Sequence, residues 1–229
     1  MTGLQARERF GMRSIDPIAL SLALALFSLV PILIITMTSF LKISIVLSLV
    51  RNALGVQQAP PNLAIYALAL LLTVYVMAPV GNQIAKLVSL DKVAQENMAI
   101  PELIEQVRKG AEPVRKFMVA NSSRDQRNFF LDRARQMWPA ELSADASPED
   151  FLIVTPAFMV SELTSAFQIG FLLYMPFIVI DLIISNILMA MGMMMVSPVT
   201  ISLPLKLFLF VMVDGWSRLI HGLVQTYHL

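Results

Sequence analysis

The feature that most constrains this sequence is a hydrophobic stretch in its last third, long enough for two membrane crossings but interrupted in unusual places. Residues 163–180 and 182–205 are uncharged, and Asp181 alone separates them. Each half could cross a hydrocarbon core about 30 Å thick. The obvious helix breakers, Ser197-Pro198 and Pro204, lie within the apolar part. Irregular backbone at membrane depth is tolerated only where protein buries it or where it lines a cavity, so the stretch indicates a pore or a substrate path.

A run of methionines directly precedes the first of these breaks. Five occur in seven residues, namely Met189, Met191, Met193, Met194 and Met195. Methionine is unbranched and polarizable, so a ring of such side chains from several subunits could close around irregular cargo and still seal when empty. Two alternatives are gap-filling in an ordinary helical core and a Cu(I) site, since thioethers are soft-metal ligands.

The composition places the chain among polytopic membrane proteins, because 57% of its 229 residues are hydrophobic and only 14% are charged. The net charge of +1 does not indicate nucleic-acid binding. Cysteine is absent, which excludes disulfides and zinc-thiolate sites. Phosphate-binding, hydrolase and zinc-protease motifs are missing, and His221 and His228 stand alone. We therefore predict no catalytic residue, no metal site, no cofactor and no enzymatic activity.

Changes in composition divide the chain into four parts. Residues 1–16 are polar, without a clear cleavage site, and we expect them to stay attached. Residues 17–80 predict a first hydrophobic hairpin, whose first helix is bent at Pro31 and whose second ends at Pro79 and Gly81. Residues 81–150 carry 21 of the 33 charged residues and predict a small soluble insert. Residues 151–229 predict a second hairpin with a methionine-rich pore loop.

The insert shows apolar residues at helical spacing and is predicted to be helical. Breaks are expected at Gly110 and at residues 121–123. Ser147, followed by a proline and two acidic residues, predicts the N-cap of the next helix, and Thr155-Pro156 offers a second start. No specific binding role is visible in the insert.

Four charged residues, Lys42, Glu162, Asp181 and Lys206, lie within or against hydrophobic spans. A charge at the centre of a membrane helix costs about 2.5 to 3.5 kcal/mol on insertion scales, so four unpaired charges would cost roughly 10 kcal/mol or more. Each charge must therefore be paired with an opposite charge or be in contact with water. Two acids and two bases indicate ion pairs, within one subunit or between neighbours, and the alternative is a proton or ion relay of a secondary transporter.

Small residues four apart follow the start of the second hairpin, as the pairs Ser161/Ser165 and Ala166/Gly170. Small residues let helices approach closely in lipid, so this region is predicted to pack against protein, either in the same chain or in a neighbouring subunit.

Two segments carry a resemblance to a known family. They are MTSFLKISIVLSLVRNALGVQQAPPN at residues 37–62, and FIVIDLIISNILMAMGMMMVSP with SLPLKLFLFVMVDGW within residues 177–216. Here the sequence closely resembles the R subunit of the type III secretion export apparatus, the relative of the flagellar protein FliP. Flagellar members usually have a cleavable signal peptide and often a second proline after the methionines. This chain has Val196-Ser197-Pro198 and no such peptide, so it resembles the virulence-type, injectisome members.

The resemblance implies an all-α membrane protein whose kinked helical hairpins assemble into a helical ring, a pentamer of this subunit. The S and T membrane subunits would join this ring to form the export gate for unfolded secretion substrates. The U subunit, inner rod and needle-base proteins would be further partners. In the family the methionine loop seals the pore, which places that role on Met193, Met194 and Met195. The family's inter-subunit ion pair corresponds to Glu162 and Lys206.

The resemblance also implies an inner-membrane location with the assembled complex protruding toward the periplasm, and a periplasmic N-terminus and insert. The arginines weakly favour the opposite orientation, because three of them precede the first helix and one follows it; they are Arg7, Arg9, Arg13 and Arg51. We follow the family. From other functional classes, a secondary or Cu(I) transporter and a non-conducting membrane scaffold stay as alternatives.

Overall fold

The computed structural model describes residues 17–56, 59–88 and 100–228, and every regular element in these ranges is an α-helix. The expected all-α class is therefore confirmed. The chain forms two compact units, the first ending at Ile34 and the second beginning at Ile35. Helix α1 (Pro17–Met37) belongs mostly to the first unit and is described by itself. The polar segment 1–16 lies outside the described residues.

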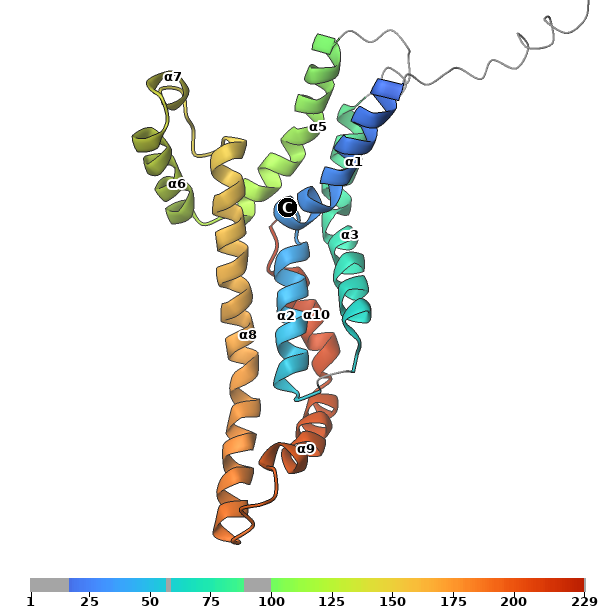
Figure 1. Cartoon of the computed structure of the whole chain (residues 1–229), viewed down its shortest axis with the longest axis vertical. Helices are drawn as coiled ribbons and strands as arrows, with labels where there is room; N and C mark the ends of the chain where they lie inside the picture. Colours follow the sequence, from blue (N-terminus) through green and yellow to red (C-terminus); the bar gives the residue numbers. More distant parts are fainter. Residues whose placement is uncertain (1–16, 57–58, 89–99, 229) are drawn as a thin grey trace, which may run out of the picture. The chain divides into compact units, whose positions relative to one another are not determined.

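The second unit is organised around helix α8 (Phe151–Ala190), the longest element (Figure 1). Helices α2, α5, α6 and α9 all contact α8, while α3 packs on α2 and α5, and α10 contacts α9. The bounds of the other helices are α2 (Phe40–Ala53), α3 (Asn62–Leu87), α5 (Ile100–Asn121), α6 (Arg124–Met137), α7 (Ala140–Ser143), α9 (Pro198–Met212) and α10 (Gly215–Gln225). Lys42 lies on α2, Glu162 and Asp181 lie on α8, and Lys206 lies on α9. The methionine run begins at the end of α8 and continues directly after it.

Two described helices, α3 and α8, are long and apolar enough to cross a membrane. The count rises to four if each of two broken helix pairs forms one span, the first from Ser28 through α2 and the second made of α9 and α10. Helix α8 has 40 residues and is therefore about 60 Å long, twice the thickness of a hydrocarbon core. A straight helix of this length must extend well beyond the apolar layer.

The main core cluster draws residues from α2, α3, α5, α8, α9 and α10. Buried apolar residues of α2 recur at helical spacing, and they are Ile43, Val46, Leu47, Val50 and Ala53. Helix α8 contributes Val154, Phe158 and Ala166 to the same cluster. A Cβ atom on Gly170 would lie 2.3 Å from Cδ1 of Leu49 and 3.3 Å from its Cβ. The glycine therefore gives room to the Leu49 side chain of α2, which would have to shift if residue 170 had a side chain.

The prolines break fewer helices than we predicted. Pro31, Pro79 and Pro204 all lie inside helices, so the predicted helix end at Pro79 and Gly81 and the predicted break at Pro204 are wrong. Proline is tolerated inside membrane helices where neighbouring groups satisfy the freed backbone. The first hydrophobic segment is instead interrupted at Thr38 and Ser39, between α1 and α2.

In the insert, the predicted break at Gly110 is also wrong, because α5 continues through it. A Cβ on Gly110 would lie 3.0 Å from Cγ2 of Val88, so the glycine gives room to the end of α3. The break predicted at residues 121–123 is confirmed: α5 ends at Asn121, and the Ser123 hydroxyl caps α6 by accepting from the Asp125 N–H at 3.3 Å.

Helix α8 begins later than predicted. Ser147 forms a turn in which its N–H donates to Oδ2 of Asp150 at 2.8 Å, and Asp150 is the N-cap. Pro156 lies within α8 and starts no helix. The break predicted at Ser197-Pro198 is confirmed, because α8 ends at Ala190 and Pro198 is the first residue of α9. Residues 191–197 form the connecting loop, called here the methionine loop.

Candidate functional site

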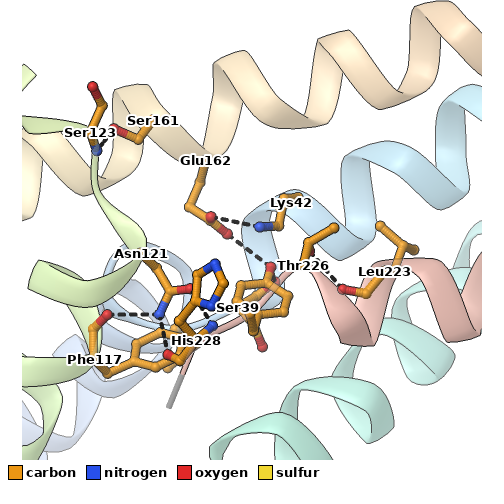
Figure 2. Close-up of polar contacts among 12 residues, drawn as sticks. Ser39, Lys42, Phe117, Asn121, Ser123, Ser161, Glu162, Leu223, Thr226 and His228 are labelled. Carbon is orange, nitrogen blue, oxygen red and sulfur yellow. Dashed lines mark hydrogen bonds and ion pairs between the residues drawn. The ribbon is translucent and has the colours of Figure 1, made fainter. Parts of the chain in front are cut away.

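The first functional feature is a buried ion pair between α2 and α8. Nζ of Lys42 lies 2.9 Å from Oε1 of Glu162, and the two side chains are 4% and 1% exposed (Figure 2). The residues are 120 positions apart in the sequence. At this burial an unpaired charge would be strongly unfavourable, so each side chain depends on the other.

Tyr227 completes this pair from the C-terminal end of the chain. Its hydroxyl donates to Oε2 of Glu162 at 2.8 Å and lies 3.1 Å from the carbonyl oxygen of Ser39. Nζ of Lys42 lies 3.8 Å from the centroid of the phenol ring, a cation–π contact. Burial, reinforced by the charge of Glu162, raises the pKa of Tyr227, so the phenol stays protonated as a donor. Both carboxylate oxygens of Glu162 are therefore satisfied inside one chain.

The tail that carries Tyr227 is itself held by α5. The rings of Tyr227 and Phe117 stack with centroids 6.0 Å apart. The side chain of Asn121 exchanges two hydrogen bonds with the backbone of His228, at 2.8 and 2.9 Å (Figure 2). This role of the tail was not predicted from the sequence. An aromatic residue near the end of the chain gives no local signal of a contact with a helix 65 positions away.

The second ion pair joins α8 to α9. Nζ of Lys206 lies 2.6 Å from Oδ2 of Asp181, and the Ser202 hydroxyl donates to Oδ1 of Asp181 at 2.6 Å. Nζ of Lys206 also lies 3.5 Å from the carbonyl oxygen of Ala53, at the end of α2. Lys206 is 4% exposed, whereas Asp181 is 36% exposed. The pair links α8 to α9.

All four charges of the apolar segments are therefore paired within the chain. The structure does not bring Glu162 and Lys206 together, because Lys42 is the partner of Glu162 and Asp181 is the partner of Lys206. A direct contact between Glu162 and Lys206 of neighbouring copies would have to expose two buried side chains. The inter-subunit pair stays a prediction.

The methionine loop lies at the end of α8 far from α6 and α7 (Figure 1). Gly192 in this loop has a φ of +72°, a conformation that favours glycine, and it turns the chain out of α8. Met193, Met194 and Met195 are 40%, 84% and 102% exposed. These side chains are therefore not gap-fillers of the chain's own core.

The small residues on α8 have partners in the chain. Ala166 is fully buried and Gly170 faces Leu49, as described above. Ser161 accepts a hydrogen bond from the Ser123 N–H at 2.9 Å and donates to the Ala157 carbonyl at 2.7 Å. Ser165 is half-buried. No group of three or more His, Cys, Asp or Glu side chains in the described ranges is placed to hold a metal ion.

Comparison with known proteins identifies the family to which this chain belongs. The FliP family model matches residues 11–223. The chain belongs to the FliP family. It is 51% identical over 216 residues to Yop proteins translocation protein R of Yersinia pestis, which covers 93% of this chain and 97% of that protein.

Two other FliP family members are similarly close. Harpin secretion protein HrcR of Erwinia amylovora is 48% identical over 212 residues, and virulence protein YscR of Salmonella typhimurium is 44% identical over 212 residues. Each alignment covers 93% of this chain and 97% of the relative. These relatives confirm the virulence-type membership of the FliP family that the sequence indicated.

Proposed function

We propose that this protein is a core, non-enzymatic subunit of the type III secretion export gate. In this role it forms the inner-membrane entry portal for unfolded proteins, as a ring of copies, a pentamer, joined by the S and T subunits. The U subunit, inner rod and needle-base proteins are further partners. Membership of the FliP family and the secretion-related names of its relatives support the assignment to a secretion apparatus. The energy for export comes from other components.

The main observation in support of the proposed gate is the exposure of the methionine loop. Met194 and Met195 are almost fully solvent-accessible although the loop connects two apolar helices. Exposed apolar side chains need a cover in the assembled state, and symmetry in a ring would place the same loop of each copy around one axis. Methionine side chains adapt to irregular surfaces, so such a ring can close on itself or around a passing chain.

The length of α8 supports a portal that rises out of the membrane. About half of its 60 Å is enough to cross the apolar layer, so the other half extends beyond it. The N-terminal half of α8 carries the contacts with α5 and α6 of the charged insert. We assign this end to the periplasmic side, as in the family resemblance.

The ion pair between Glu162 and Lys206 of neighbouring copies belongs to this proposal. In such an arrangement Lys42 and Asp181 would stay close to their present partners, because neither can be left alone in the apolar core. The contact would then join two in-chain pairs into one alternating row of four charges across the subunit boundary.

The experiment that tests the gate replaces Met193, Met194 and Met195 by alanine in the assembled complex, and measures ion leak across the inner membrane together with secretion. Loss of the thioether side chains is expected to open a leak while the complex still assembles. The matched control replaces Met137 and Met212, which are also exposed, at 79% and 69%, but lie in α6 and α9. The control variant is expected to cause no ion leak across the inner membrane.

Three results separate the alternatives. A leak confined to the loop variant establishes the seal. If the loop variant assembles and shows no ion leak, the methionines do not seal the pore. A specific loss of copper handling in that variant, without a leak, favours the Cu(I) transporter instead, since methionine is a Cu(I) ligand.

A further inference from the structure

A cavity of about 240 Å³ lies where α2, α8, α9 and α10 meet. Its lining is apolar apart from one arginine, and includes Val50, Leu173, Phe177, Phe210, Leu219 and Arg218. An apolar cavity of about 150 Å³ already stays dry and holds a benzene-sized ligand. This one is partly open at its rim and has room for a segment of hydrocarbon chain.

The cavity is built into the bend between α9 and α10. The two helices meet at 62°. Asp214 at the bend has φ 52° and ψ 48°, the left-handed conformation. A Cβ on the next residue, Gly215, would lie 2.4 Å from the ring of Phe210. The bend therefore combines a left-handed residue at Asp214 with a position, Gly215, where the Phe210 ring leaves no space for a side chain.

Arg218 gives the cavity a charged rim. Its side chain is exposed, and no acidic side chain in the described part of the chain pairs with it. The nearest acid in sequence, Asp214, accepts instead from the Ser217 hydroxyl at 3.0 Å. Trp216 lies beside the cavity, with its ring edge-on to Phe210 at 5.3 Å. Tryptophan and arginine together are typical of the level of the lipid headgroups.

We propose that this cavity binds one acyl chain of an anionic phospholipid whose phosphate pairs with Arg218. The apolar lining accommodates the chain, the unpaired guanidinium is complementary to the phosphate, and the tryptophan places the rim at headgroup depth. The lipid would fill the gap left by the bend and hold α10 against α8. This site is separate from the methionine loop and from both ion pairs.

The two tryptophans of the chain allow a direct test. In a Trp138→Phe background only Trp216 fluoresces. The full-length protein is placed in phosphatidylcholine nanodiscs containing a small fraction of either phosphatidylglycerol or phosphatidylcholine with brominated acyl chains, which quench a nearby indole. The phosphatidylglycerol form is expected to reach half-quenching at about one-fifth of the fraction needed by the phosphatidylcholine form, because the choline cation compensates the phosphate charge only in the latter.

Three variants make the test decisive. Arg218→Gln is expected to abolish the difference between the two lipids, and Leu173→Phe, which fills the cavity, to weaken quenching by both. The control, Arg133→Gln on α6, is expected to change neither. Equal quenching curves in the parent protein, or an undiminished preference in Arg218→Gln, would overturn the proposal. So would relief of quenching by inorganic phosphate alone, which would mark a simple anion site.

Discussion

The buried pair of Lys42 and Glu162 gives the sharpest prediction for stability. Lys42→Met removes one charge and Glu162→Leu removes the other, so each single variant leaves a buried charge without its partner. The double variant Lys42→Met/Glu162→Leu removes both. The reference pair is Lys109→Met with Glu105→Gln on α5, where the atoms lie 3.6 Å apart and the side chains are 50% and 53% exposed.

The magnitudes follow from burial. Breaking a buried pair by removing one partner costs about 3–5 kcal/mol, and side chains 4% and 1% exposed belong in that class. Replacing both by apolar residues is expected to cost little, because no charge is left to desolvate. The Tyr227 hydroxyl then keeps the Ser39 carbonyl at 3.1 Å as an acceptor. The exposed reference pair is expected to change stability by about 0.5 kcal/mol or less.

The assay is denaturant unfolding of the purified full-length protein in detergent, followed by helical circular dichroism, and the quantity compared is the free energy of unfolding. Strong non-additivity is expected, with the double variant more stable than either single variant. Single variants that lose less than about 1 kcal/mol, or whose losses simply add in the double, would refute the reasoning.

Charge reversal in the assembled complex decides between the two partners of Glu162. If the in-chain pair dominates, Glu162→Lys is rescued by Lys42→Glu. If the inter-subunit pair dominates, it is rescued by Lys206→Glu. Subunit crosslinking and secretion are the readouts. Rescue by Lys206→Glu alone would show that assembly replaces the in-chain contact, contrary to what its burial implies.

Two further predictions concern single contacts. Tyr227→Phe is expected to lower the free energy of unfolding by about 1.5–3 kcal/mol, since a hydrogen bond to a charged group is lost while the ring stays. Its control is Ser39→Ala, which removes a buried hydroxyl that has no partner in the described structure; a loss as large as that of Tyr227→Phe would contradict this assignment. Gly170→Ala is expected to cost about 1–3 kcal/mol because its Cβ meets Leu49, whereas Gly81→Ala, with open space around it, is expected to be neutral or slightly stabilising in the same unfolding assay. Equal effects of the two alanines would argue against the close approach of α2 and α8.

Breaks in the helices show where sequence reasoning is weakest. Ser197-Pro198 was located correctly because proline at the first helical position is a local preference. Pro79, Pro204 and Gly110 were misjudged for the opposite reason. Their local cost is a few kcal/mol at most, and packing against neighbouring helices outweighs it.

The sequence by itself determined the class of the protein, the position of the methionine loop and the need for every intramembrane charge to have a partner. These follow from hydrophobic length and from the cost of a charge in an apolar medium, which depend on composition along the chain. Only the tertiary structure decided which partners meet. Lys42 and Glu162 are 120 residues apart, and Tyr227 joins them from the tail. Their contact depends on how closely α2 and α8 approach, which is set at positions such as Gly170 and not by any local pattern around the charges.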